Sequence, residues 1–270
     1  MNKNITFLGA GSAAEAILSG IIKAGIVERN RIRMTNRNNI KRREYLEEQY
    51  QITCCENKEK AVREADIIIL AMKPYDLQES LSEIKSYINK QQLLISILAG
   101  VSTETIIREL NVSLPVIRAM PNTSAMVGYS ATALTKGRHA DREHMELAEE
   151  LFDTIGTTTI VDENDMHIVT AISGSGPAYI YYMVEAMESA AIEAGLDQKV
   201  AKELITHTVI GAGEMLQKTG ERADILRKKI TSPHGTTEAG ISVLEKNHFQ
   251  KIMMDCVKNA QQRSEELGKG

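Results

Sequence analysis

A glycine-rich turn near the start of the chain constrains the fold more than any other feature. The apolar residues 5–8 lead into Gly9, a second glycine follows at Gly11, and the small Ala14 precedes a helical pattern. In this order, the first glycine allows a tight turn, and the second lets a pyrophosphate approach the backbone because it has no Cβ. The N–H groups and the dipole of the helix start favour the phosphate charge. The spacing predicts a dinucleotide site, with an ordinary glycine-containing turn as the alternative.

The same alternation of strand and helix continues through the first half of the chain. The apolar run within residues 66–71 is typical of a parallel strand that is buried on both faces, and residues 93–98 form another expected strand. Further strands are expected at residues 31–36, 114–119, 129–134 and 157–161, and helices at 13–23, 57–64, 75–87 and 141–152. This order predicts an α/β fold, a Rossmann-type doubly wound sheet with right-handed crossovers. The loops after the strands would form its ligand crevice.

The character of the chain changes at Glu163, where strands disappear and long helical patterns take over. We therefore place a boundary between a dinucleotide-binding domain, residues 1–162, and an all-α domain, residues 163–270. Helices are expected over 177–194 and 198–218, and another begins near Asn247. The first of these is apolar on more than one side, so it needs more cover than a small helical domain supplies. The pattern predicts a homodimer or a higher homo-oligomer formed through a C-terminal dimerisation domain.

Composition and charge argue against several classes of protein. The 270 residues are 43% hydrophobic and 25% charged, and the formal net charge of −4 offers no general attraction to nucleic acid or to an anionic membrane. No apolar segment approaches the ~20 residues that span a bilayer, and the start has no apolar signal-peptide core. We expect a cytoplasmic protein that binds neither nucleic acid nor a membrane. The cysteines and the six scattered histidines lack the spacing of a metal site, so all three thiols are interpreted as structural.

The end of the second expected strand bears on the choice of dinucleotide. A site that prefers NAD places a carboxylate there for the ribose 2′-hydroxyl, whereas this chain has Asn36 and Arg37. Asn36 can donate to a 2′-phosphate and Arg37 can pair with one, so the sequence favours NADPH, with NADH as a second cofactor. In the alternative interpretation, the basic residues among 37–43 are only the solvated face of the next helix.

Two polar, glycine-bearing turns in the second half are candidates for holding a substrate. Residues 173–177 and 232–237 each precede an expected helix, and together they could hold a small anion against a nicotinamide. Taken singly, each is better explained as an ordinary N-cap, and only the two together favour a site. The sequence shows no Ser/His/Asp constellation and no catalytic carboxylate pair. Hydride transfer needs neither, since the cofactor carries the reaction and the protein supplies position and electrostatics.

Five longer motifs resemble those of the pyrroline-5-carboxylate reductase family. They are LAMKP at 70–74, AGV at 99–101, RAMPNT at 118–123, SGSGPAY at 173–179 and TSPHGTT at 231–237. With the glycine turn, the resemblance extends over nearly the whole chain. It implies an oxidoreductase that uses NAD(P)H to reduce 1-pyrroline-5-carboxylate to L-proline, the last step of proline biosynthesis. It also implies a dimer in which the helical domains interlock.

The resemblance implies three groups of site residues. At the cofactor phosphates and ribose it places Gly9, Gly11, Ser12, Ala13, Asn36 and Arg37. Along the cofactor and beside its nicotinamide it places Ala71, Lys73, Pro74, Ala99 and Gly100. Around the substrate it places Asn122, Ser175, Gly235, Thr236 and Thr237. Thr237 is the catalytic candidate that would orient the ring nitrogen, while Lys73 either tunes the charge near the cofactor or has a structural role beside Pro74.

The chain departs from the family pattern in three places, which involve four residues. The family usually has Asn-Met in place of Ser12-Ala13, proline in place of Ser124 and glycine in place of His234. The first two changes are expected to alter the cofactor fit slightly. The His234 imidazole is expected to point to solvent, with anion binding as the alternative.

Other functions are less consistent with these residues. A 3-hydroxyacid dehydrogenase of the same two-domain plan would need a catalytic lysine on the helix over 177–194, which contains none. A regulatory protein that senses dinucleotides without turnover would not need the intact substrate motifs. A nucleic-acid-binding role for residues 37–43 would need interleaved aromatic residues and an overall positive charge.

Overall fold

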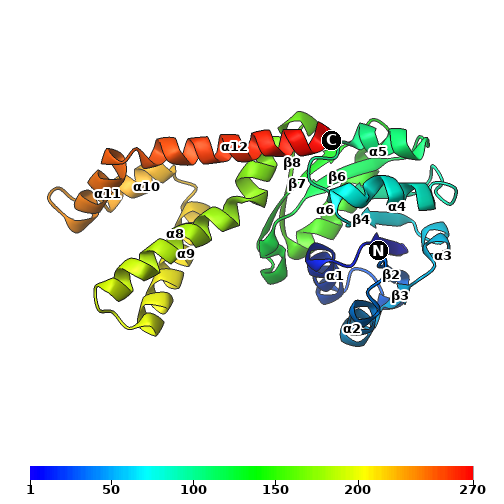
Figure 1. Ribbon diagram of the computed structural model, residues 1–270, viewed down its shortest axis with the longest axis horizontal. Coiled ribbons are helices and arrows are strands. Elements are labelled where there is room, and N and C mark those ends of the chain that lie inside the picture. Colours follow the sequence, from blue (N-terminus) through cyan, green and yellow to red (C-terminus); the bar gives the residue numbers. More distant parts are fainter. Residues whose placement is uncertain (270) are drawn as a thin grey trace. The chain divides into compact units, whose positions relative to one another are not determined.

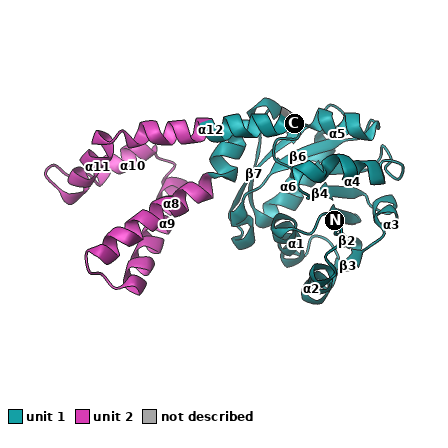
Figure 2. Ribbon diagram, viewed as in Figure 1, with its two compact units in different colours: residues 1–175, 259–270 teal, residues 176–258 magenta. Residues whose placement is uncertain are grey.

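The computed structural model describes residues 1–269 of the chain, which divide into two compact units. Unit 1 contains Met1–Ser175 together with the end of the chain from Asn259, and unit 2 contains Gly176–Lys258. Figure 2 shows unit 1 in teal and unit 2 in magenta. Each unit is described separately below.

An eight-stranded sheet forms the centre of unit 1, with strand order β3-β2-β1-β4-β5-β6-β7-β8 (Figure 1). The strands are β1 (Ile5–Leu8), β2 (Ile32–Thr35), β3 (Thr53–Cys55), β4 (Ile67–Leu70), β5 (Leu93–Ser96), β6 (Val116–Met120), β7 (Ser130–Lys136) and β8 (Gly156–Ile160). Because β1 lies between β2 and β4, the chain winds outward from it in both directions. The predicted Rossmann-type doubly wound sheet is confirmed.

Two details of the sheet differ from the prediction. β7 runs antiparallel to β6, while the other paired strands are parallel. The connection between these two strands is too short for the crossover that a parallel neighbour requires. β3 was not predicted, because its three residues are too few to establish an alternating pattern.

Helices pack on both faces of this sheet. Those of unit 1 are α1 (Ser12–Ala24), α2 (Ile40–Tyr50), α3 (Lys58–Arg63), α4 (Leu77–Ile84), α5 (Thr103–Leu110), α6 (Arg142–Phe152) and α7 (Met166–Val169). Ile67 and Ile69 of β4 join one buried cluster with α1, and Ile68 and Leu70 join another with α4 and α5. Alternate residues of a strand point to opposite faces, so a continuous apolar run is what a strand covered on both sides requires.

The stretch before α8 corrects one expectation. Residues 173–177 were predicted to form a turn, but Thr170–Gly174 is a π-helical segment that follows α7, and α8 begins at Gly176. The wider turn is held by the amide of Ser175, which donates to the carbonyl of Thr170 at 2.9 Å. A π-helical segment is common at functional sites and cannot be recognised from a glycine and serine pattern alone.

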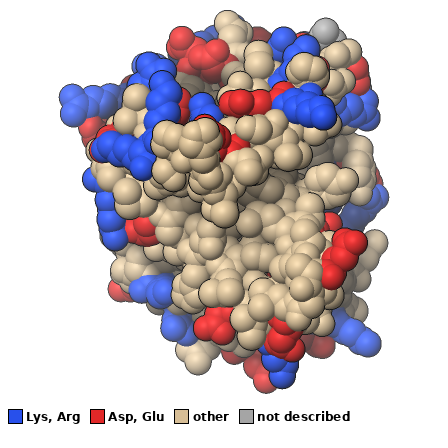
Figure 3. Space-filling model, turned by 90° about the vertical axis from the view of Figure 1, so that its left-hand side faces the viewer, with Lys and Arg blue, Asp and Glu red and all other residues tan. Residues whose placement is uncertain are grey.

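Unit 2 consists of helices: α8 (Gly176–Glu193), α9 (Gln198–Thr219), α10 (Ala223–Lys229), α11 (Thr236–Lys246) and the first part of α12 (Phe249–Lys269). α8 and α9 pack against each other, and Ala201 and Ile205 are the residues buried there within the chain. Large apolar side chains on both helices are exposed, among them Ile180, Tyr182, Met183, Met187, Leu204 and Ile210. Figure 3 shows a face with few charged side chains at its centre. Apolar exposure on this scale is typical of a surface that makes contact with another molecule.

Within residues 1–269, none of the helices is both long enough and apolar enough to pass through a lipid bilayer.

Candidate active site

The carboxyl ends of neighbouring strands bring the predicted cofactor segments of unit 1 to one edge of the sheet. The amide of Gly9 donates to the carbonyl of Thr35 at 3.1 Å, and the amide of Ala71 donates to the carbonyl of Leu8 at 2.9 Å. The residues that follow β1, β2 and β4, including Asn36, therefore lie side by side. This edge, where the winding direction changes, is where open α/β sheets bind their ligands.

The glycine turn fits the pyrophosphate of a dinucleotide. Gly9 has φ of +119°, and a Cβ placed on it would lie 2.4 Å from the carbonyl oxygen of Ala71, so only glycine can occupy the position. Gly11 is the N-cap of α1 and makes no side-chain cap, and nothing lies within 4 Å of the place where its Cβ would be. A pocket of about 330 Å³ covers the turn and extends to Asn36 and Arg42. The helix start thus offers backbone N–H groups to an anion, with space to reach them.

A half-buried network of hydrogen bonds fastens α2 to this turn. The Nε of Arg42 donates to the carbonyl of Ala10 at 2.8 Å, and its Nη2 lies 2.5 Å from the carboxylate of Glu15. The hydroxyl of Tyr50 donates to the same carboxylate at 3.0 Å. Burial alone would raise the pKa of Glu15, but the hydrogen bonds from Arg42 and Tyr50 outweigh it and hold the pKa below its usual value. Arg42 is therefore a structural part of the cofactor pocket rather than a member of a solvated face.

Asn36 and Arg37 both line the pocket at the end of β2. The side-chain oxygen of Asn36 accepts from the amide of Asn39 at 2.8 Å and turns the chain toward α2. The guanidinium of Arg37 pairs with the carboxylates of Asp76 and Glu79. Lys73 is exposed and lies at the N-cap of the short helix Pro74–Asp76.

A second cavity brings together residues from all three predicted groups of unit 1. It has a volume of about 320 Å³ and contains Ser12 and Ala13 from α1, Ala99 from the loop after β5, and Asn122 and Ser175. The amide group of Asn122 donates to the carbonyl of Ser173 at 3.0 Å, which ties the loop after β6 to the π-helical segment. Polar groups in an otherwise apolar hollow of this size are typical of a small-molecule site.

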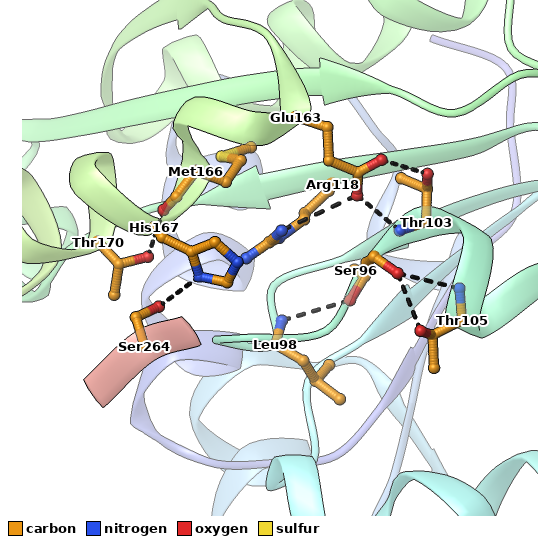
Figure 4. Close-up of polar contacts among 11 residues, drawn as sticks. Ser96, Leu98, Thr103, Thr105, Arg118, Glu163, Met166, His167, Thr170 and Ser264 are labelled. Carbon is orange, nitrogen blue, oxygen red and sulfur yellow. Dashed lines mark hydrogen bonds and ion pairs between the residues drawn. The ribbon is translucent and has the colours of Figure 1, made fainter. Parts of the chain in front are cut away.

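The loop that contains Gly100 is followed by Thr103, which Glu163 holds in place beside the buried Arg118. The sequence motifs did not identify Glu163 as a functional residue. Glu163 accepts from the amide and hydroxyl of Thr103, at 2.7 and 2.6 Å, and lies 3.8 Å from a guanidinium nitrogen of the buried Arg118 (Figure 4). Gly100 has φ of +80°, and a Cβ there would lie 3.1 Å from the amide nitrogen of Gly268 in α12. The predicted nicotinamide loop therefore packs tightly against the end of the chain.

The same cluster includes a histidine and a serine. The Nδ1 of His167 and the hydroxyl of Ser264 are 3.0 Å apart, and Ser264 is buried (Figure 4). This contact joins α7 to the last part of α12. These residues lie far apart in the sequence and form no local motif, so no sequence signal could have identified them.

Gly235, Thr236 and Thr237 lie in unit 2, at the start of α11. A Cβ on Gly235 would lie 2.7 Å from the hydroxyl and 3.0 Å from the carbonyl oxygen of Ser232, so a larger residue would require Ser232 to shift. His234 is exposed within the chain, and its amide donates to Glu238 at 2.7 Å. Its φ of +59° is a conformation that glycine adopts more easily than histidine.

Comparison with known proteins identifies the family. Residues 163–267 match the family model described as pyrroline-5-carboxylate reductase dimerisation, and residues 4–100 match that of NADP oxidoreductase, coenzyme F420-dependent. Pyrroline-5-carboxylate reductase 2 of Bacillus subtilis is 46% identical over 265 residues, which cover 98% of this chain and 95% of the relative. The chain belongs to the pyrroline-5-carboxylate reductase family.

Other members of the family agree over the full length. The enzyme of Arabidopsis thaliana is 36% identical over 97% of this chain and 95% of the relative. The solved pyrroline-5-carboxylate reductase of Coxiella burnetii superimposes with a TM-score of 0.92 at 34% identity, covering 100% of both chains. The Plasmodium falciparum enzyme, solved with NADP bound, gives 0.90 at 29% identity, covering 99% of this chain and 98% of that one.

Family membership confirms a Rossmann-type sheet followed by a helical dimerisation domain. The matched dimerisation region begins at residue 163, whereas unit 2 begins at Gly176, after α7 and the π-helical segment. The boundary predicted after residue 162 separates two functional domains and stays a prediction, because the compact units are divided at a different place, after Ser175.

Proposed function

We propose that this protein reduces 1-pyrroline-5-carboxylate to L-proline with NAD(P)H, the last step of proline biosynthesis. The observation that carries the proposal is the cavity of about 320 Å³ that unites the start of α1, the loop containing Ala99, and the pair Asn122 and Ser175. Relatives named as this enzyme are 35–46% identical over nearly the whole chain. The protein acts as an oxidoreductase on a C=N bond.

In the proposed mechanism the chain binds the cofactor and the substrate, orients them toward each other and excludes water from between them. The backbone at Gly9, Gly11, Ser12 and Ala13 holds the pyrophosphate at the dipole of α1. NAD(P)H, when bound, supplies the hydride. Ala71, Lys73 and Pro74 flank the cofactor, and Ala99 and Gly100 hold the position of its nicotinamide through their packed loop.

The substrate residues orient an imine that is already electrophilic when it is protonated. Asn122, Ser175, Gly235 and Thr236 surround the small ring, and the hydroxyl of Thr237 orients its nitrogen. Lys73 either tunes the charge near the cofactor or has a structural role beside Pro74. Alignment of the two rings and retention of the carboxylate supply most of the catalysis, so no dedicated acid is needed.

We further propose the state and location in which the protein works. It prefers NADPH, accepts NADH, and acts in the cytoplasm without nucleic acid or membrane partners. It forms a homodimer or a larger homo-oligomer, because the apolar side chains of α8 and α9 are exposed in the single chain and the family carries a dimerisation domain. The functional division lies between residues 1–162 and 163–270.

Replacement of Thr237 by alanine tests the proposal. We expect kcat/KM for 1-pyrroline-5-carboxylate to fall about 100-fold, the usual effect of removing a donor aimed at the reacting group. Ser82→Ala, which removes an exposed hydroxyl that donates to the carbonyl of Gln78 within α4, is the control and should leave kcat/KM unchanged. Unchanged efficiency in Thr237→Ala would remove this residue from the mechanism. Cofactor binding without turnover in the unmodified protein would instead favour a dinucleotide sensor.

A further inference from the structure

The pocket at the end of β2 holds more acidic than basic side chains. Arg37 and Lys58 line it, and so do Asp76, Glu79 and Glu83. Lys58 pairs with Glu83, and Arg37 pairs with the other two carboxylates. A site for a phosphate dianion is expected to have the opposite balance.

The two carboxylates that hold Arg37 come from one neighbouring segment. Asp76 ends the short helix after β4, and Glu79 lies in the first turn of α4. The Nη2 of Arg37 is 2.5 Å from Glu79, and its Nη1 is 3.5 Å from Asp76. Since β1 separates β2 from β4 in the sheet, the guanidinium and the carboxylates meet beside Gly9, which lines the same pocket.

The position of Arg37 beyond β2 is where a 2′-phosphate on the adenosine ribose would be recognised. To pair with that phosphate, Arg37 must leave Glu79, and the phosphate must then lie near two carboxylates. A ribose with a free 2′-hydroxyl carries no charge, so it neither separates Arg37 from Glu79 nor is repelled by the carboxylates. The two acidic residues therefore act against NADPH and leave NADH almost unaffected.

We propose that Asp76 and Glu79 are specificity-determining residues, which hold Arg37 and reduce the preference for the 2′-phosphorylated cofactor. This inference rests on the proposed cofactor site, and it adds residues to that site which the family motifs do not contain. The balance between NADPH and NADH is then set by the competition between a phosphate and two carboxylates for a single guanidinium.

Isothermal titration of the full-length protein with NADP⁺ and with NAD⁺ tests the proposal without using turnover. In Glu79→Gln, the ratio of the Kd for NAD⁺ to the Kd for NADP⁺ should rise roughly fivefold, the scale of one exposed charge interaction. The rise should come from tighter NADP⁺ binding, and 1 M salt should reduce it. Asp76→Asn should act in the same direction.

Two controls make the result specific. Glu104→Gln removes an exposed carboxylate of α5 that pairs with Arg138 outside this pocket, and it should leave the ratio unchanged. In an Arg37→Gln background, Glu79→Gln should lose the part of its effect that comes from releasing the guanidinium, and only the smaller part from repulsion between the carboxylate and the phosphate should remain. An unchanged ratio in Glu79→Gln, or an equal gain without Arg37, would overturn the inference.

The same titration separates this inference from the proposed function. If the unmodified protein binds neither dinucleotide, the cofactor site itself is wrong. If it binds both, and substitutions at residues 76 and 79 leave the ratio of the two Kd values unchanged, the cofactor site stands and only the specificity assignment fails.

Discussion

Replacing Glu163 with glutamine tests how a buried charge is held behind the predicted nicotinamide loop. Arg118 of β6 is 1% exposed, and its Nη1 lies 3.8 Å from Glu163. Within residues 1–269, its Nε and Nη2 have no hydrogen-bond partner. Burial lowers the pKa of the Arg118 guanidinium, and the charge of Glu163 opposes that shift. Glu163 is therefore the counter-charge that makes a buried arginine tolerable at this place.

The size of the effect follows from burial and from two further hydrogen bonds. Removing one partner of a fully buried pair costs about 3–5 kcal/mol, but the side chain of Glu163 is 29% exposed, so we expect about 2 kcal/mol. Glutamine also turns an amide NH₂ or a single acceptor toward the two donors of Thr103. In a chain of this size, the melting temperature should fall by about 6 °C.

Thermal and urea unfolding measure this difference, at equal protein concentration because the protein associates. Glu104→Gln is the matched control, since that carboxylate is 58% exposed in its pair with Arg138, and its loss should cost less than about 0.5 kcal/mol. The double change Arg118→Met with Glu163→Gln should regain part of the stability, because no unpaired charge remains. Equal melting temperatures for Glu163→Gln and Glu104→Gln would show that Glu163 is not the counter-charge of Arg118.

Three further predictions follow from the same unit. Gly9→Ala should weaken NADP⁺ binding at least about tenfold in titration calorimetry, because its Cβ would meet the carbonyl of Ala71; retained affinity would contradict the tight turn. The lowered pKa of Glu15 gives stability that is present at neutral pH and lost as the pH falls below about 4, so the deficit of Glu15→Gln should shrink there in acid-unfolding curves. Burial raises the pKa of Cys54 to about 12, so iodoacetamide at pH 8 should modify it only after unfolding, as mass spectrometry would show.

Much of the fold of unit 1 could be predicted from local patterns. The buried run at Ile67–Leu70 needs apolar residues on both faces, and α1 ends at Ala24, one residue beyond the expected helix over 13–23, with Gly25 as its left-handed C-cap at φ of +67°. The antiparallel direction of β7 and the π-helical segment Thr170–Gly174 were not predictable in this way. Both depend on how the surrounding chain packs rather than on residue spacing.

In the candidate site, too, the features set by local residue spacing could be predicted, and those set by contacts between distant segments could not. The glycine turn could be predicted, because its chemistry needs Gly9 and Gly11 at a fixed spacing. The ion pairs of Arg37 could not, since its partners lie 39 and 42 positions away on another element. The sequence therefore predicted that the Arg37 side chain is free to bind a phosphate, whereas in the structure its guanidinium is already paired with two carboxylates.

The most direct test of the account uses NADPH carrying deuterium at C4 of the nicotinamide, on the transferred face. The protein is incubated with this cofactor and 1-pyrroline-5-carboxylate, and the product is analysed by mass spectrometry. The account predicts L-proline with one deuterium on the ring carbon next to nitrogen that does not bear the carboxylate. Proline without deuterium under both face labels, or no proline at all, would contradict it.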